Sequence, residues 1–256
     1  MGMHFGILAA DLPWAEFQPL LWSRTGRFID QGVGEGTAFD DFDLEPNDEG
    51  YPTLVGEYQG RSYVLDTSSR MSMIGVDFIA ELSKAADTLV IGCGAETVSG
   101  TYFFLAARSG EVLRQFYHCQ ALLSEPFDEG DLLPTEDEKD FEDFDGEGLI
   151  AGLGHFGFDF EAWTREGKRQ LYLYTADEVK ASEERGVLLR GPLAERMDEH
   201  NATYALSEEE RPSIQLITRD ATTRQIVSMQ DTGLRLGDDQ INDPGFWRRF
   251  WDRLAN

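Results

Sequence analysis

The chain has 256 residues, of which 41% are hydrophobic and 12% aromatic, so it is long enough to bury one large core or two small ones. It carries 48 acidic against 22 basic residues, a formal net charge of −26. A field of that sign repels nucleic-acid phosphates and anionic membranes, which argues against direct binding of either, and it attracts basic proteins.

The first fifty residues predict a strand, a helix and a loop. Residues 3–10 suit a short strand, and Pro13 suits the first turn of a helix that carries Trp, Phe and Leu side chains. We expect Pro19 to kink this helix or to end it early, because proline has no amide hydrogen. Residues 30–50 are rich in Gly, Asp and Glu, which predicts a loop.

The next seventy residues predict mostly strands. Residues 53–58 and 62–66 alternate as a hairpin does, and the turn between them is Gln59-Gly60-Arg61. Apolar spacing predicts a helix over 76–86. Three further strands are predicted at 88–93, 101–108 and 111–120.

From residue 124 onward the sequence predicts a second acidic loop, followed by a mixture of helices and strands. A helix is predicted over 148–165, although Gly152, Gly154 and Gly157 weaken its intrinsic propensity. Later predicted elements are a strand at 170–175, a helix from Asp177-Glu178, a helix at 193–200, a hairpin at 213–219 and 225–230, and a C-terminal helix that opens at Asp243.

These elements predict an α+β fold with a mostly antiparallel sheet and flanking helices. A similar order of elements occurs in residues 12–120 and 148–230. One interpretation is two pseudo-repeated lobes, at 1–124 and 148–256, on either side of an acidic loop at 125–147. The other is one continuous domain, because hairpins and helices recur in any α+β protein.

Two acidic segments are the strongest functional signal. Residues 125–147 contain twelve acidic side chains and one lysine, and residues 30–49 contain eight acidic and no basic side chains. Each contains a phrase in which Phe alternates with carboxylates, at 39–43 and 141–145. Carboxylates can steer a basic partner and aromatic rings can anchor it, so both phrases are predicted to dock a protein. The alternative is a pair of solvated loops whose rings pack on their own core.

The docking interpretation names nine partner-binding residues in the two phrases. These are Asp40, Asp41, Phe42, Asp43, Asp140, Glu142, Asp143, Phe144 and Asp145.

Other motifs predict no chemistry. The stretch from Asp143 matches the first six positions of a calcium-binding EF-hand loop, but its twelfth position is Gly154 where a bidentate Glu is required. The glycines at 152, 154 and 157 fit G-x-G-x-x-G but follow an acidic loop rather than a strand. No catalytic motif is found, so we predict no enzyme activity, no cofactor and no metal site.

Cysteine content and the N-terminus indicate the expected compartment. Cys93 and Cys119 lie in apolar stretches and make no disulfide framework, so both are expected to be small buried hydrophobes. The N-terminus has no basic segment before a long apolar run, and no stretch approaches the roughly 20 apolar residues of a membrane span. A cytoplasmic protein is therefore expected.

One part of the chain resembles a known class of proteins. The residues concerned are 96–104, Ser109-Gly110-Glu111, 133–136 and 145–149, within roughly residues 50–165. They look like uncharacterised bacterial proteins found beside secreted toxins as immunity proteins. The resemblance implies that the protein binds and neutralises one cognate basic toxin and has no catalytic residue. The alternatives are an enzyme or ligand-binding domain with an unrecognised site, and an acidic mimic of nucleic acid.

Overall fold

Nine strands and five helices make up most of the described part of the chain. The computed structural model describes residues 4–32, 44, 49–67, 76–96, 101–119, 127–133, 146–188, 195–196 and 199–200. The strands are β1 (His4–Ala10), β2 (Ile29–Gly32), β3 (Gly50–Tyr58), β4 (Arg61–Asp66), β5 (Leu89–Glu96), β6 (Thr101–Arg108), β7 (Glu111–Cys119), β8 (Phe127–Gly130) and β9 (Lys168–Thr175). The helices are α1 (Trp14–Thr25), α3 (Val76–Ala86), α4 (Gly146–His155), α5 (Phe160–Glu166) and α6 (Ala176–Leu188).

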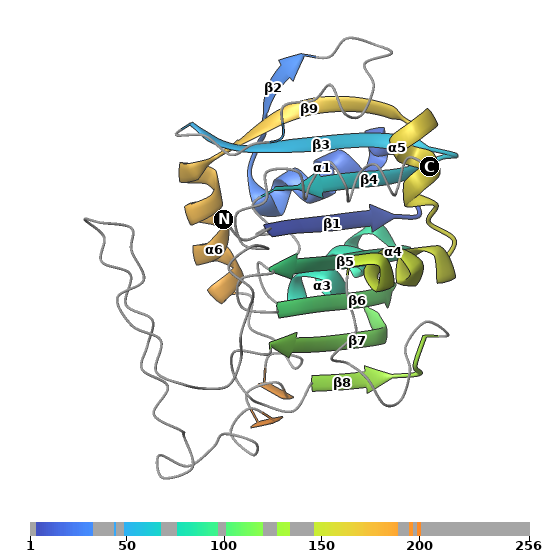
Figure 1. The fold of residues 1–256 in the computed structure, drawn as a ribbon. Helices are drawn as coiled ribbons and strands as arrows, with labels where there is room; N and C mark the ends of the chain where they lie inside the picture. The colour runs from blue at the N-terminus through green and yellow to red at the C-terminus, as the bar shows by residue number, and fades with distance from the viewer. Residues whose placement is uncertain are drawn as a thin grey trace, which may run out of the picture.

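The strands form a single sheet in the order β2-β9-β3-β4-β1-β5-β6-β7-β8, and each neighbouring pair is antiparallel (Figure 1). This confirms the expected α+β fold with a mostly antiparallel sheet and flanking helices. The strand at 168–175 lies between β2 and β3, so segments from both ends of the described chain share one half of the sheet.

The central strands are apolar on both faces, because helices cover the sheet on both sides. Along β1, Phe5, Ile7 and Ala9 lie in one core, whereas Leu8 and Ala10 lie in the other. The same alternation continues along β4, β5 and β6. Strands buried on both faces have near-continuous apolar sequences, which explains why residues 3–10 and 88–93 lack a polar stripe.

Each core has its own helices. The front core lies beneath α4 and α5 through Leu149, Leu153 and Trp163, which are fully buried. The back core lies beneath α1, α3 and α6, which contribute Phe17, Leu21, Phe78, Ile79, Leu82 and Val179. Figure 1 shows α4 and α5 in front of the sheet and α1 and α3 behind it. We call these the front face and the back face.

Gly92 in β5 is explained by close packing on the back face. A Cβ atom at Gly92 would lie 2.6 Å from the Cδ1 atom of Ile79 in α3. Only glycine lets the helix approach the sheet this closely. The sequence Gly92-Cys93-Gly94 therefore belongs to the core, and burial raises the pKa of the fully buried Cys93 thiol.

Two strands were wrongly expected to be loops. The loop predicted over 30–50 contains β2 and the start of β3, and the acidic loop predicted over 124–148 contains β8 and the start of α4. Both β2 and β8 are four-residue strands at the edges of the sheet. Such short edge strands need no alternating apolar pattern, because hydrogen bonds to one neighbouring strand hold them.

The single helix expected over 148–165 was also wrong, because the chain breaks it into α4 and α5. Gly157 has a φ of +85°, in the left-handed region that ends a helix. The carboxylate of Asp159 then starts α5 by accepting a hydrogen bond of 2.8 Å from the backbone N–H of Ala162. At Gly152, a Cβ atom would lie 2.9 Å from the Phe104 ring, so this glycine lets α4 approach β6.

Helix α1 continues through Pro19 to Thr25, so the proline does not end it. Pro19 faces solvent, where water can hydrogen-bond the carbonyl that lacks an amide partner. The first turn of α1 has no cap from its own sequence, and the carboxylate of Glu57 in β3 accepts a 3.0 Å hydrogen bond from the backbone N–H of Trp14 instead. The predicted hairpin at 213–230 and the C-terminal helix lie outside the described residues.

Candidate functional site

All nine partner-binding residues predicted from the sequence lie outside the described residues. Asp40, Asp41, Phe42 and Asp43 precede Leu44, which is described. Asp140, Glu142, Asp143, Phe144 and Asp145 precede Gly146, the first residue of α4. The structure therefore does not test whether these side chains come together, but it places the residues to which both phrases are covalently joined.

Both Phe-Asp phrases are joined to the front core. Leu44 packs against this core, and it follows Asp43 directly, at one residue spacing of about 3.8 Å. On the other side, α4 begins directly after Asp145, and its Leu149 and Leu153 are buried in the same core. The chain that directly follows each phrase, Leu44 or α4, therefore packs on the front core.

The two acidic segments also begin at opposite edges of the sheet. The first segment, 30–49, includes most of β2, whose Ile29 is 52% exposed, and the second, 125–147, includes β8. Leu132, at 40% exposed, and Ile29 are the exposed large apolar side chains of the described chain. Each segment thus overlaps an edge strand, and Leu44 in the first and α4 at the end of the second pack on the front core.

Exposed charges on the described surface are also predominantly acidic, with more than two exposed carboxylates for each exposed basic side chain. These carboxylates occur on both faces, for example Glu16 and Asp177 on the back-face helices and Asp159 and Glu161 beside α5. Because they are spread out, they supply a general negative field and do not select one docking direction. Directional selection would have to come from the two acidic segments.

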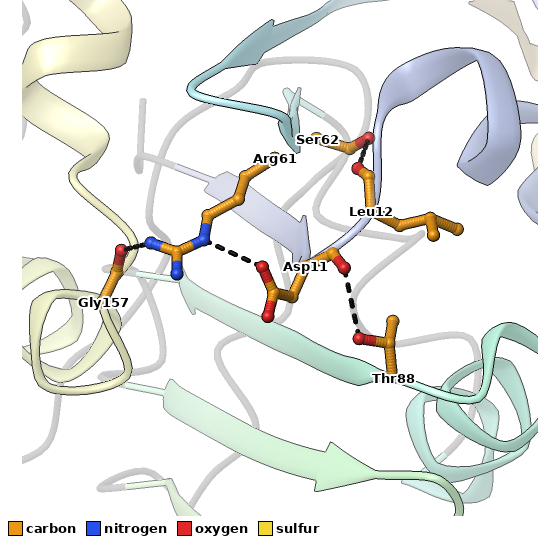
Figure 2. A network of polar contacts seen from close by, with 6 residues as sticks. All are labelled: Asp11, Leu12, Arg61, Ser62, Thr88 and Gly157. Carbon is orange, nitrogen blue, oxygen red and sulfur yellow. Dashed lines mark hydrogen bonds and ion pairs between the residues drawn. The ribbon is translucent and has the colours of Figure 1, made fainter.

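A polar network joins the turns at one end of the sheet (Figure 2). The Arg61 Nε atom lies 3.0 Å from Oδ1 of Asp11, and the same guanidinium donates a hydrogen bond to the Gly157 carbonyl between α4 and α5. Thr88 donates a hydrogen bond of 3.2 Å to the Asp11 carbonyl, and Ser62 donates one of 2.6 Å to the Leu12 carbonyl. One arginine therefore ties together the ends of β1 and β4 and the turn after α4.

Aromatic side chains lie beside this network. The Arg61 guanidinium carbon is 5.3 Å from the centre of the Phe158 ring, a cation–π distance. Phe158 packs edge-on against Tyr63, which in turn stacks on Trp163 with 5.1 Å between ring centres. Burial raises the pKa of Tyr63 to about 12, although the positive charge of Arg61 opposes this shift.

The contacts of this network position the backbone. Ser62 and Thr88 each donate to a backbone carbonyl. Asp11 and Arg61 form an ion pair whose side chains are 47% and 31% exposed. We interpret this network as the support that holds α4, and thus the end of the second acidic segment, against the sheet.

A second arginine holds the β8 edge. Arg114 in β7 is fully buried, and its guanidinium pairs with the Asp128 carboxylate. The same side chain donates hydrogen bonds to the carbonyls of Gln115, at 3.0 Å, and Glu129, at 2.8 Å. A buried guanidinium needs such acceptors, because an unpaired charge in the interior is costly.

Sequence reasoning missed both arginines. Arg61 was treated only as part of a turn, and Arg114 lies in a strand that shows no unusual pattern. A signal was present for Arg114, because a charged residue inside a predicted strand, between Leu113 and the Gln115-Phe116 pair, requires a partner if it is buried. Its partner lies in β8, which the sequence did not predict, so the pair could not be named.

Metal and membrane sites are not found in the residues that the structure describes. These residues contain no group of three His, Cys, Asp or Glu side chains placed to hold a metal ion. The EF-hand match from Asp143 is broken because its positions from Gly146 onward are helical. None of the helices in this part of the chain is long and apolar enough to cross a membrane.

Comparisons with known proteins give no match of any kind. No protein-family model matches the chain, and neither do the curated proteins or the solved structures with which it was compared. Functional reasoning therefore rests on the sequence and the geometry of this chain.

Proposed function

We propose that this protein is a binding protein that docks a basic partner through its two acidic Phe-Asp segments, and that the partner is a cognate bacterial toxin that it neutralises. The observation that carries the docking proposal is the covalent connection of both segments to the same front core, through Leu44 and through α4. The identity of the partner rests on the resemblance of residues 50–165 to immunity proteins.

Charge and apolar anchors have different roles in this proposal. Asp40, Asp41, Asp43, Asp140, Glu142, Asp143 and Asp145 attract the partner during approach. Phe42 and Phe144 supply the apolar contact area that slows dissociation. The remaining surface carboxylates raise the encounter rate without fixing the orientation of the partner.

The identity of the partner is tested by affinity capture of the full chain from its native cells, followed by co-expression. We expect one basic protein to be recovered at about one copy for each copy of this chain. We also expect co-expression of this chain to rescue cells that express that basic protein. If the recovered partner is a nucleic-acid-binding protein, and if added nucleic acid displaces it from this chain, the result would instead favour an acidic mimic of nucleic acid. Turnover of a small molecule by the purified chain would favour an enzyme.

The docking residues are tested with two variants of equal charge. The variant Asp40→Asn/Asp41→Asn/Asp43→Asn removes three charges from the first segment, and Glu16→Gln/Asp177→Asn/Glu184→Gln removes three exposed charges from the back-face helices. We expect the first to slow association with the captured partner about tenfold at low salt, and the second to slow it less. Equal slowing by both variants would contradict docking at the front face.

Salt gives an independent test of steering. The Debye length falls from about 10 Å at 0.1 M to about 3 Å at 1 M, so the association rate of the native chain should fall steeply over this range. The dissociation rate should change less, because the phenylalanine contacts do not depend on salt. An association rate that salt leaves unchanged would rule out steering.

A further inference from the structure

The edge strand β8 is contacted by residues from the far end of the described chain. β8 pairs with β7 on one side, and two short helical pieces, Glu195–Arg196 and Glu199–His200, supply further contacts to its side chains. We call Arg196 and His200 together the β8 strap. Figure 1 shows these pieces in orange, below and to one side of β7 and β8.

The first strap contact is a two-pronged ion pair. Arg196 Nε lies 2.7 Å from Oε1 of Glu129, and Nη2 lies 2.9 Å from Oε2. A fork of this kind matches the planar guanidinium to the carboxylate and is the strongest common geometry for such a pair. Glu129 and the nearby carboxylate of Asp77 both raise the pKa of Arg196, so the strap remains charged.

The second strap contact is apolar. The ring centres of His200 and Phe127 are 5.4 Å apart and the rings are nearly perpendicular. Phe127 belongs to the back core and is only 7% exposed. Phe127 and Glu129 are two residues apart in one strand, so both side chains lie on the same face of the sheet. The strap therefore engages one face of β8, and Arg114 holds Asp128 on the other.

The strap occupies a carboxylate, that of Glu129, which a basic partner would seek. Glu129 belongs to the second acidic segment, 125–147, and Asp131 and Leu132 just after it are exposed. Arg196 presents to Glu129 the same chemical group that a basic protein would present. Because both side chains of this ion pair are about one-third exposed or more, an outside guanidinium can reach the same carboxylate.

We propose that the β8 strap is an autoinhibitory contact: Arg196 is an internal occupant of Glu129 that an arginine-bearing partner displaces when it docks. This inference rests on the proposed docking function. Because β8 is an edge strand, a partner at the front face reaches the back-face side chain of Glu129 around that edge. The displaced strap frees Glu129 for the partner and uncovers Phe127 beside it. The chain would thus select partners that offer enough cationic contacts to compete with its own arginine.

The strap itself is tested without any partner, by hydrogen exchange on the full chain. Arg196→Gln breaks the fork, and we expect backbone amides of β8 and the paired part of β7 to exchange about threefold faster, as for a surface ion pair. The matched control is Lys180→Gln, which removes one exposed positive charge from α6. Unchanged exchange in β8, or equal acceleration in β1, would overturn the strap.

A charge reversal separates the fork from general destabilisation. Glu129→Arg should accelerate exchange in β8 as Arg196→Gln does. The double variant Glu129→Arg/Arg196→Glu rebuilds the pair with its partners exchanged, and we expect it to restore most of the lost protection. Failure of the double variant to recover any protection would contradict a pairwise contact.

Competition is tested with an arginine octapeptide as the cationic probe. Arg196→Gln should tighten probe binding about threefold, because the internal competitor is lost, whereas Lys180→Gln should tighten it less. Glu129→Gln should weaken binding although it also releases the strap. Equal affinities for Arg196→Gln and Lys180→Gln would overturn autoinhibition. In that case the hydrogen-exchange experiment would still show that Arg196 protects β8. Failure of the docking function is a different outcome, which the affinity-capture experiment detects.

Discussion

The centre and the edges of the sheet are held by different forces. In β1, β4, β5 and β6, apolar side chains are buried on both faces, and the register follows from this burial. At the edges, β2 and β8 have four residues each and depend on particular polar contacts, such as Asp30 with Gln170 and Asp128 with Arg114. The centre can therefore tolerate changes of surface charge, whereas the edges, where the acidic segments begin, depend on charge.

The largest expected effect is on the centre. Trp163→Ala removes a fully buried ring that stacks on Tyr63, and we expect it to lower the free energy of unfolding by about 3–5 kcal/mol. The edge counterpart is Ile29→Ala in β2, which should change the same quantity by less than about 0.5 kcal/mol because the side chain is exposed. Urea denaturation measures both, and similar costs would break the contrast between centre and edge.

The next effect concerns the edge pair Arg114–Asp128. Asp128→Ala removes the carboxylate that pairs with the buried guanidinium of Arg114, and we expect a loss of about 2–3 kcal/mol. Arg114→Met removes the buried charge and keeps an apolar side chain of similar length, so about 1 kcal/mol is expected. The order of these two midpoints in urea is the decisive result. If Arg114→Met were the more harmful change, the guanidinium would contribute more than the cost of burying it.

Replacing two glycines, one in α4 and one in the turn after it, by alanine should change the free energy of unfolding in opposite directions. Gly157→Ala places a side chain at a φ of +85° and brings its Cβ atom to 3.2 Å from the Arg61 guanidinium, so we expect a loss of about 1–2 kcal/mol. Gly154→Ala lies in α4 with no atom within 4 Å of the new Cβ, so a gain of about 0.5–1 kcal/mol is expected. Thermal unfolding of both variants tests the pair, and equal signs would contradict the turn geometry.

The smallest effect at neutral pH concerns Tyr63. Burial raises its pKa from 10.0 to about 12, so the folded state holds the phenolic proton more tightly than the unfolded chain. This contribution to stability is fully present below pH 10 and is lost as the pH rises towards 12. Tyr63→Phe should therefore reduce the loss of stability over that range, measured by urea denaturation at each pH. The same alkaline loss in both proteins would show that Tyr63 does not cause it.

The difference between the centre and the edges of the sheet also explains which elements could be predicted from the sequence. Helix α3 was predicted with its observed ends, and the β6–β7 hairpin to within a residue, because apolar spacing and the Ser109-Gly110 turn are local signals. The edge strand β2 was missed because its partner is distant: Ile29 pairs with Leu173. The edge strand β8 was missed although it pairs with the nearby β7, because its four residues Phe-Asp-Glu-Gly show no strand pattern. Arg61 was missed because its partners lie 50 and 96 residues away, and Arg114 because its partner lies in β8.

Of the candidate site, the composition of the two acidic segments could be read directly, but their attachment could not. Nothing in the sequence near Leu44 indicates that it packs on the same core as α4, since that core is assembled from strands spread across 170 residues of chain. The three glycines in this stretch already weakened the predicted helix. The sequence did not show that Gly157 was the one that takes a positive φ and separates α4 from α5.

The place of β9 has a consequence for how the chain is made. β3 pairs with β9 over more than 100 residues of sequence, and β9 is also the partner of β2. While a ribosome is still synthesising residues before 168, β3 has an open edge and β2 has no partner strand in the sheet. A nascent chain of that length would expose backbone groups to which another nascent chain could add. β9, the last strand that the structure describes, thus closes this half of the sheet, and we expect a chain that ends before it to be prone to aggregate.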